Sequence, residues 1–309
     1  MKFCMKIVVL DGYSINPGDL SWDALAALGS LEIYGRTSED EFFERAAGAN
    51  ILLIAKVPIT AEALDRLPEL RYLGVLATGY NMVEVEATRA RGIVLTNVPS
   101  YGTMSVAQFA IALLLELCNR VGVHNRAVIE GEWYRSPDWT MPKTPLMELA
   151  GKTMGIVGYG RIGRQTALIA EALGMRILPI DTGDPLEPLL VASDVVSLHC
   201  PLTPESQGMI HRGTIERMKP SALLINTARG PLIVEQDLAD ALNSGRIAGA
   251  GLDVLSIEPP IHQNPLITAK NCIVTPHIAW ATKEARERLL NVAIDNVRAF
   301  LAGCPQNTV

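Results

Sequence analysis

Residues 151–181 contain the pattern that decides the fold, GKTMGIVGYGRIGRQTALIAEALGMRILPID. An apolar run at 154–157 predicts a buried strand, and three glycines follow it: Gly158, Gly160 and Gly163. In a dinucleotide-binding turn, the first glycine permits the turn, the second lets backbone approach a pyrophosphate, and the third lets helix pack against strand. Because a glycine-rich turn alone is weak evidence, the interpretation depends on the elements around it.

These elements complete a strand–helix–strand unit. A helical pattern covers 161–173, a second apolar run covers 177–180, and that run ends at Asp181. A helix that begins at the glycines points the positive end of its dipole at a bound phosphate. Asp181 stands near the place where this fold needs a carboxylate for the adenosine ribose. A carboxylate there repels a 2′-phosphate, which favours NAD over NADP; the alternative is a structural βαβ turn.

Composition narrows the class of protein. The chain has 309 residues, enough for about two domains, and its 49% hydrophobic and 19% charged residues are typical of a globular protein. Its formal net charge of −6 argues against nucleic acid or an anionic membrane surface as a partner. The N-terminal apolar run is too short for a signal peptide, and the apolar stretch at 109–118 is too short to span a bilayer. We expect a protein that acts on a small molecule.

The cysteines indicate the compartment. Their number is odd, and none of their spacings is that of a C-x-x-C pair or a zinc site. They are Cys4, Cys118, Cys200, Cys272 and Cys304. The pattern favours a reducing compartment, so we expect a cytoplasmic protein.

Short apolar runs alternate with helical patterns along the rest of the chain. Strands are predicted at 7–10, 33–34, 51–54, 72–76, 93–95, 195–198, 223–225, 248–252 and 272–274. Helices are predicted at 21–28, 38–47, 60–67, 83–91, 104–129 and 283–301. Repeated β-then-α units imply parallel sheets covered by helices, so the fold class is α/β with two doubly wound domains.

The order of these elements predicts the domains. The first half has no dinucleotide fingerprint of its own, and we expect the last helix to return to it. The segment 133–145 has two tryptophans and several prolines, and we expect an ordered excursion that packs on another subunit. The predicted organisation is a flavodoxin-like substrate domain over 1–100, a Rossmann cofactor domain over 101–282 inserted into it, and a returning helix over 283–309.

Reactive side chains follow four of the predicted strands. Ligands of an open parallel sheet bind at the carboxyl ends of its strands, so residues at these ends are the candidates for chemistry. The four endings are HCP at 199–201, NTARG at 226–230, the segment 253–260, and PHIAW at 276–280. A nicotinamide carries the hydride, so the protein must orient the substrate and supply a proton.

Three residues suit these tasks. The guanidinium of Arg229 can hold a carboxylate through two parallel hydrogen bonds, and His277 can exchange a proton near neutrality. Glu258, if it meets the ring, favours the charged imidazolium. The alternatives are a turn cap for Arg229, a solvated loop acid for Glu258, and a core histidine satisfied by backbone for His277.

The other candidates have weaker patterns. His199 is expected beside the cofactor or in packing, and Asp253 either touches the nicotinamide amide or only ends a strand. The remaining histidines lack partners at ligand spacing and are expected to be solvated or packed: His124, His211 and His262. There is no H-E-x-x-H, cysteine cluster or G-x-S-x-G, so neither a metal nor serine hydrolysis is predicted.

Together these motifs resemble the D-isomer-specific 2-hydroxyacid dehydrogenases. In that family's order they are GYGRIG (158–163), HCPLTPES (199–206), NTARGPLI (226–233), GLDV with EP (251–259) and PHIAWAT (276–282). The resemblance covers nearly the whole chain. It implies that Arg229 holds the substrate carboxylate, that His277 is the general acid/base, and that Glu258 is its partner.

The fingerprint and the resemblance together predict the ligand contacts. The predicted NAD-binding residues are Gly158, Tyr159, Gly160, Arg161, Ile162, Gly163, Asp181, His199, Cys200, Pro201, Thr227, Ala228 and Asp253. The predicted substrate-binding residues are Ala77, Thr78, Gly79, Arg229 and Trp280, the first three through backbone amides. We also expect a homodimer through the region 104–145.

The substrate follows from the same resemblance. Trp280 is similar to the tryptophan of hydroxypyruvate and glyoxylate reductases, also called glycerate dehydrogenases, and it would narrow the pocket. We therefore expect a small 2-keto acid; the alternatives are phosphoglycerate or D-lactate dehydrogenase activity and, more remotely, a non-catalytic NAD-sensing protein like the C-terminal-binding-protein corepressors. The segment between Asp181 and Ala192 is shorter than is usual in the family, which predicts a truncated sheet edge.

Overall fold

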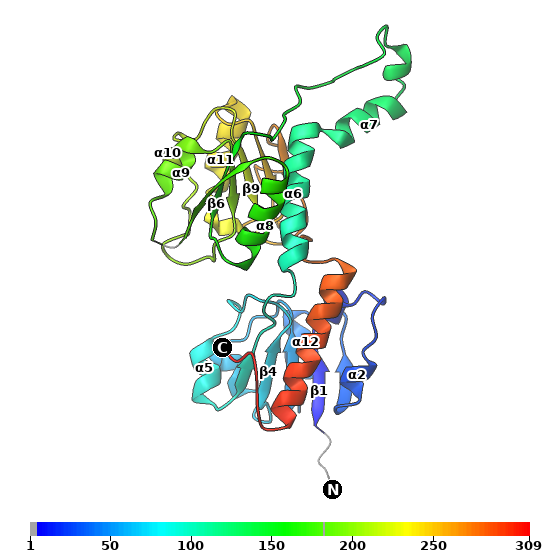
Figure 1. Ribbon diagram of the computed structural model, residues 1–309. Coiled ribbons are helices and arrows are strands. Elements are labelled where there is room, and N and C mark those ends of the chain that lie inside the picture. The colour runs from blue at the N-terminus through cyan, green and yellow to red at the C-terminus, as the bar shows by residue number, and fades with distance from the viewer. Residues whose placement is uncertain (1–4, 182) are drawn as a thin grey trace. The chain divides into compact units, whose positions relative to one another are not determined.

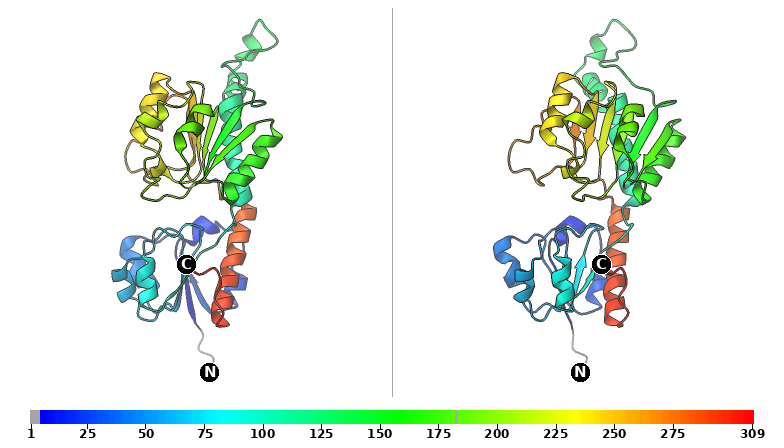
Figure 2. Two further views of the ribbon diagram at one scale, coloured as in Figure 1. Left: turned by 60° about the vertical axis from the view of Figure 1, so that its left-hand side comes forward. Right: turned by 90° about the vertical axis from the view of Figure 1, so that its left-hand side faces the viewer.

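The computed structural model describes residues 5–181 and 183–309, so Cys4 lies outside the described residues. The chain forms two compact units (Figure 1). Unit 1 consists of Met1–Gly102 and Ala281–Val309, and unit 2 consists of Thr103–Trp280. Each unit has its own parallel β-sheet covered by helices (Figure 2), which confirms the predicted α/β class.

Unit 1 has a five-stranded sheet in the order β2-β1-β3-β4-β5, the flavodoxin-like order. All its strand pairs are parallel, and its central strands β3 and β4 are buried along their whole length, as expected when helices cover both faces. The strands are β1 (Lys6–Val9), β2 (Ser30–Ile33), β3 (Ile51–Ile54), β4 (Tyr72–Val75) and β5 (Val94–Thr96). The helices are α1 (Gly12–Ile15), α2 (Asp23–Ala26), α3 (Glu39–Ala46), α4 (Ala61–Asp65) and α5 (Val85–Ala90).

The last helix, α12 (Lys283–Leu301), also belongs to unit 1. The Thr282 hydroxyl caps it by accepting the Ala285 N–H at 3.2 Å. Arg286 is buried and donates two hydrogen bonds of 2.7 Å to the Asp19 carboxylate, a bidentate ion pair. These contacts attach the C-terminal helix to a loop from the start of the chain.

Unit 2 has a six-stranded parallel sheet in the order β11-β10-β9-β8-β6-β7. The chain runs from β6 to β7 on one side, then crosses to the other side and continues from β8 to β11. The order therefore reverses between β6 and β8, the switch point where an open α/β sheet binds its ligand. The strands are β6 (Thr153–Val157), β7 (Arg176–Ile180), β8 (Val195–Leu198), β9 (Leu223–Asn226), β10 (Gly249–Leu252) and β11 (Cys272–Val274). The helices that follow β6 are α8 (Arg161–Ala172), α9 (Leu186–Ala192), α10 (Arg212–Ile215), the 3-10 turn η2 (Gly230–Leu232) and α11 (Glu235–Ser244).

Strand β7 is the outermost strand on its side of unit 2 within the described residues. A dinucleotide-binding sheet in the order 3-2-1-4-5-6 has one further strand outside this position. Here α9 begins at Leu186, soon after β7 ends. The predicted truncation of the sheet edge is thus confirmed.

The region after Gly102 differs from the prediction of one helix over 104–129. The structure has two helices, α6 (Thr103–Asn119) and α7 (Val121–Ile129), with a bend of 55° between them. The chain turns at Arg120, whose φ of 50° is left-handed, and a Glu116 carboxylate oxygen accepts the Gly122 N–H at 3.2 Å. The prediction was wrong because both halves have helical periodicity, while the break depends on one backbone angle and one side-chain contact.

Helix α6 packs in the core of unit 2, whereas α7 and the residues after it extend away from the sheet (Figure 1). We call residues 120–146, which include α7 and the 3-10 turn η1 (Trp133–Arg135), the arm. In the described part of the chain, no single helix is long and apolar enough to cross a membrane. Within the same described residues, the bent pair of α6 and α7 passes that test of length and composition.

Candidate active site

The glycine turn leads from β6 into α8 at the switch point of unit 2. Gly158 has a φ of +93°, and a Cβ at this position would lie 2.5 Å from the Cys200 backbone nitrogen. A Cβ at Gly163 would lie 2.2 Å from the Gly158 carbonyl oxygen. Both positions therefore require glycine, the first for the turn and the second for the approach of helix to strand.

Gly160, in contrast, has open space where a side chain would stand. It is the N-cap of α8, and a Cβ built on it would meet no atom within 4 Å. The first amide groups of a helix, here from Arg161, Ile162 and Gly163, have no acceptor within the helix, and no side chain caps them. The positive end of a 12-residue helix is thus open to an anion, which fits a pyrophosphate.

The loop after β8 packs against this turn. The His199 Nε2 is hydrogen-bonded to the Ser197 hydroxyl at 2.8 Å, and desolvation lowers the pKa of His199 to about 4. Burial also raises the pKa of the Cys200 thiol. Both side chains are therefore uncharged at neutral pH and suit contact with an uncharged part of a cofactor.

The loop after β9 is shaped by Asn226, which is fully buried. Its Oδ1 accepts the Ala228 N–H at 3.0 Å, and its Nδ2 donates to the Arg229 carbonyl at 2.8 Å. Thr227 Oγ1 is buried without a hydrogen-bond partner among the described residues. A buried hydroxyl without a partner costs about 1–3 kcal/mol. A bound cofactor that supplied the partner would remove this cost, so the loop fits the predicted dinucleotide.

Asp181 follows β7 and is exposed. Its amide N–H donates to Asp184 Oδ2 at 2.8 Å, so a second carboxylate lies at the same strand end. Two carboxylates suit the hydroxyl groups of a ribose and disfavour a 2′-phosphate.

Glu258 and His277 form a close polar contact beyond β10 and β11, on the other side of the sheet from β7. Glu258 Oε2 lies 2.6 Å from His277 Nδ1, and both side chains are partly exposed. Glu258 Oε1 accepts the Leu255 N–H at 3.0 Å, so both oxygens are held. A carboxylate on Nδ1 fixes the ring and leaves Nε2 for a proton-transfer partner, the arrangement of a general acid/base and its orienting group.

Asp253 holds the loop that carries His277. Its side chain is buried, and the pKa of its carboxyl is raised by that burial. The carboxylate accepts hydrogen bonds from the Thr275 hydroxyl at 2.6 Å, the Ile278 N–H at 3.0 Å and the Ala279 N–H at 2.7 Å. These bonds support a φ of 55° at His277, an uncommon value for a residue with a side chain. Asp253 is thus a positioning group for this loop, and its contact with nicotinamide stays a prediction.

Topology brings the three predicted catalytic residues to one edge. Arg229 follows β9, Glu258 follows β10 and His277 follows β11, and these three strands are neighbours. Because they are parallel, their carboxyl ends meet at the same edge of the sheet as the glycine turn after β6. The edge combines an anion site, a guanidinium and a carboxylate–imidazole pair, which define a dinucleotide-dependent oxidoreductase.

The predicted substrate loop lies in unit 1, after β4. The Thr78 hydroxyl donates to the Val98 carbonyl at 2.9 Å, and the Thr78 carbonyl accepts from Asn97 Nδ2 at 2.7 Å. Within the described residues, the amides of Ala77, Thr78 and Gly79 donate to no backbone carbonyl. Three such amides in a held loop suit a carboxylate. Trp280 is the last residue of unit 2 in the chain, and its side chain is partly buried.

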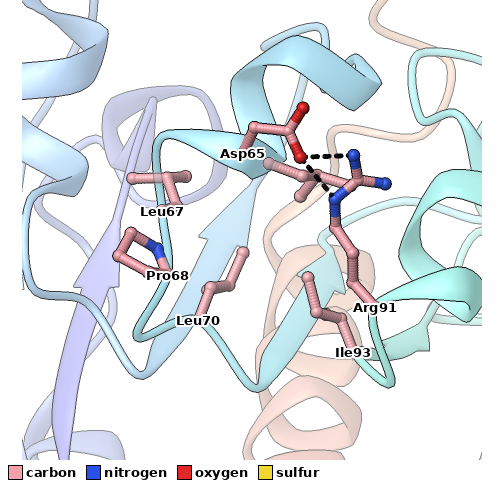
Figure 3. A pocket seen from close by; sticks show the side chains of 7 residues that line it. Asp65, Leu67, Pro68, Leu70, Arg91 and Ile93 are labelled. Atoms are coloured by element: carbon pink, nitrogen blue, oxygen red, sulfur yellow. Dashed lines mark hydrogen bonds and ion pairs between the residues drawn. The ribbon is translucent and has the colours of Figure 1, made fainter.

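Unit 1 also has a hollow at a different place from the loop 77–79 (Figure 3). Apolar side chains such as Leu67 and Leu70 line it beside the Asp65–Arg91 ion pair, whose Oδ1–Nε distance is 3.0 Å. Leu70 and Ile93 precede β4 and β5, so the hollow lies at the amino edge of the sheet. Ligands of parallel sheets bind at the other edge, so this hollow is not a candidate site.

Sequence reasoning missed several residues that shape the site. Ser105, in the first turn of α6, is buried and donates to the Ala279 carbonyl at 2.5 Å. Asn226 and Thr275 organise the loops around Arg229 and His277. Asn226 stands inside the quoted NTARG motif, which was a usable signal, whereas nothing in the sequence connects Ser105 with residue 279. Among the described residues, no group of three His, Cys, Asp or Glu side chains could hold a metal ion.

Comparison with known proteins identifies the class. The model of the D-isomer specific 2-hydroxyacid dehydrogenase, NAD binding domain, matches residues 111–279. This chain belongs to that family and contains its NAD-binding domain. It is therefore an NAD-dependent oxidoreductase acting on 2-hydroxy acids.

Individual relatives cover most or nearly all of the chain. A hydroxypyruvate reductase of Blautia hydrogenotrophica is 52% identical and covers 99% of both chains. A glycerate dehydrogenase of Methylorubrum extorquens is 43% identical over 87% of this chain and 88% of its own. The crystal structure of the TT0316 protein from Thermus thermophilus has a TM-score of 0.88 at 35% identity and covers 99% of this chain and 100% of its own.

Proposed function

We propose that this enzyme reduces a small 2-keto acid, such as hydroxypyruvate or glyoxylate, to the D-2-hydroxy acid. The observation that carries the proposal is the 2.6 Å contact between Glu258 and His277, at the same sheet edge as Arg229 and the glycine turn. The names of the two relatives, a hydroxypyruvate reductase and a glycerate dehydrogenase, support a substrate of this size.

Each residue has one task in this proposal. NADH, when bound, supplies the hydride to the keto carbon. His277, oriented by Glu258, donates a proton to the developing alkoxide. Arg229 holds the substrate carboxylate through parallel hydrogen bonds, and the amides of the loop 77–79 are a second set of donors that suit a carboxylate. Trp280 limits the size of the substrate.

The cofactor contacts follow the fit described above. Gly158, Gly160 and Gly163 accommodate the pyrophosphate at the start of α8, beside Tyr159 and the amides of Arg161 and Ile162. Asp181 binds the ribose hydroxyls and favours NAD over NADP. The remaining contacts are proposed for His199, Cys200, Pro201, Thr227, Ala228 and Asp253.

One panel of substrates tests the proposal. kcat/KM is measured for hydroxypyruvate, glyoxylate, pyruvate and 3-phosphohydroxypyruvate, each with NADH and with NADPH. We expect the highest values for hydroxypyruvate or glyoxylate with NADH. A preference for pyruvate or for the phosphorylated acid would instead indicate D-lactate or phosphoglycerate dehydrogenase activity. Binding of NADH without turnover of any acid would indicate a dinucleotide-sensing protein and overturn the enzymatic proposal.

The variant His277→Ala serves as the catalytic control in the same assay. It should lower kcat by about 100-fold or more, as expected when general acid/base catalysis is lost. NADH binding, followed by fluorescence, should persist, since His277 lies in the loop after β11 and not in the glycine turn. Turnover close to that of the wild type would contradict the role of His277.

We also infer a homodimer that forms through the arm, and a cytoplasmic location. The arm exposes large apolar side chains, with Tyr134 96% and Trp139 87% exposed. Several large apolar side chains exposed on one short segment favour an interaction site there. The described cysteines are all free thiols, which suits a reducing compartment and is testable by cell fractionation.

A further inference from the structure

A carboxylate outside the proposed catalytic set holds the segment that carries Glu258. It is Glu235, the first residue of α11, which is partly buried. One of its oxygens, Oε1, accepts the Ser256 N–H at 2.8 Å, and the other, Oε2, accepts from Asn264 Nδ2 at 2.8 Å. Glu235 thus joins the two ends of the segment 256–264, and Glu258 lies between these ends.

The backbone of two consecutive residues, Leu255 and Ser256, links this contact to the catalytic residues. The Leu255 N–H donates to Glu258 Oε1 at 3.0 Å, while the Ser256 N–H donates to Glu235. The peptide between these two residues touches Gly230, where a Cβ would lie 2.1 Å from the Leu255 carbonyl oxygen. Because Gly230 follows Arg229 directly, the backbone of Leu255 and Ser256 contacts Glu258, Glu235 and the Arg229 loop.

The donors to Glu235 are themselves fixed in orientation. Asn264 Oδ1 accepts the Leu266 N–H at 3.0 Å, so the Asn264 amide cannot rotate without losing that bond, and its Nδ2 is directed at Glu235. A carboxylate in the first turn of a helix is also favoured by the helix dipole. Both oxygens of Glu235 therefore have assigned donors.

We propose that Glu235 is a positioning residue for the Glu258–His277 pair. By holding Ser256 and Asn264, it keeps Glu258 Oε2 within hydrogen-bond distance of His277 Nδ1. The inference rests on the proposed function, since it matters only if this pair transfers a proton. A displacement of about 1 Å would break a 2.6 Å contact, and a misplacement of that size can lower a rate on the order of 100-fold.

Asp237 provides a matched control in the same helical turn. Its Oδ2 accepts the N–H of Arg212, the first residue of α10, at 2.8 Å, so it also ties a neighbouring segment to α11 through a carboxylate and a backbone amide. Helix α10 carries none of the proposed catalytic residues. A merely structural role for Glu235 predicts equal effects when either carboxylate is removed.

The test compares Glu235→Ala, Glu235→Gln and Asp237→Ala by kinetics and melting temperature. We expect Glu235→Ala to lower kcat at least about tenfold with unchanged NADH affinity, and Asp237→Ala to leave kcat unchanged at a similar loss of Tm. Glu235→Gln keeps an acceptor for Ser256 but faces Asn264 with a second donor, so its kcat should lie between wild type and Glu235→Ala. In a Glu258→Ala background, Glu235→Ala should lower kcat no further, because it acts through Glu258.

Equal loss of kcat in Glu235→Ala and Asp237→Ala, or additive losses with Glu258→Ala, would overturn the proposal. Hydrogen exchange of the amides in 255–264 gives a readout that needs no turnover. Exchange should be faster in Glu235→Ala than in Asp237→Ala; equal exchange rates would show that Glu235 does not hold the segment. If the wild type reduces no 2-keto acid, the proposed function fails, and the exchange experiment still decides whether Glu235 holds the segment.

Discussion

Two carboxylates hold the residue that we assign as the proton donor. Glu258 contacts the His277 ring at 2.6 Å, and Asp253 binds the backbone on the far side of His277 through Ile278 and Ala279. The backbone of His277 is held in the left-handed region, a conformation that a residue with a side chain adopts only when its surroundings enforce it. The position of the ring is therefore built in before any ligand binds.

At the same scale, the lowered pKa of His199 predicts that the free energy of unfolding depends on pH. Desolvation lowers its pKa to about 4 in the folded chain, whereas the pKa of a histidine in an unfolded chain is about 6.5. Between these values the unfolded state binds more protons, so the free energy of unfolding falls as the pH falls through this window. We expect a loss of about 1–3 kcal/mol from pH 7 to pH 4.5, measured as the shift of the urea unfolding midpoint.

The comparison that isolates this effect uses His199→Gln. Other groups also titrate in this range, so only the difference between wild type and variant is informative. The variant should lose less stability over the same pH step, while His262→Gln, at an exposed position, should behave like the wild type. The same pH dependence in wild type and His199→Gln would contradict the assignment.

At the scale of elements, we propose that the end of β7 contacts the adenosine part of the cofactor. No described strand lies outside β7, and the carboxylates of Asp181 and Asp184 come together at its carboxyl end. On this proposal, the choice between NAD and NADP depends on the charges of these two carboxylates.

We expect Asp181→Ala to shift the cofactor preference toward NADP. Removal of the carboxylate removes its repulsion of a 2′-phosphate and also its hydrogen bonds to the ribose. The ratio of kcat/KM with NADPH to that with NADH should rise about tenfold or more, which corresponds to about 1.4 kcal/mol. Steady-state assays with both cofactors at a fixed keto-acid concentration measure the ratio.

Asp184→Ala is the matched variant for this experiment. Its carboxylate accepts the Asp181 N–H, so its loss should change the same ratio in the same direction but less. An unchanged ratio in Asp181→Ala would mean that this strand end does not contact the ribose.

At the scale of the whole molecule, the arm has apolar surface that the described chain does not cover. Substitution of Trp139 by Arg should weaken the proposed homodimer, because it places a charge where apolar surface would be buried. Light scattering coupled to size-exclusion chromatography should show the wild type as a dimer and Trp139→Arg shifted toward monomer at micromolar concentration. Circular dichroism should confirm that the variant is folded.

Ile267 offers a control outside the arm. It is 52% exposed in the segment before β11, so Ile267→Arg adds the same charge to exposed apolar surface elsewhere in unit 2. This variant should remain a dimer. A monomeric wild type, or dissociation by both variants alike, would refute a dimer interface on the arm.

Much of the fold was predictable because its strands are continuous apolar runs. Strands such as β3 at 51–54, β8 at 195–198 and β11 at 272–274 were predicted with the bounds that the structure has. The break at Arg120 was not predictable in this way, since helical periodicity continues across it. Short helices such as α1 (Gly12–Ile15) also left no periodic signal, because four residues are too few to show one.

The residue types of the site could also be predicted from the sequence. The contacts that hold those residues in place could not. The sequence alone determined the α/β class, the glycine turn, and the presence of Arg229, Glu258 and His277 at strand ends, because side-chain chemistry and apolar periodicity are local properties. Only the tertiary structure decided that Glu258 meets His277, that Asp253 and Ser105 hold the loop after β11, and that Glu235 holds the Glu258 segment. Those contacts join residues far apart in the chain, and their geometry exists only after the parallel strands have been brought side by side.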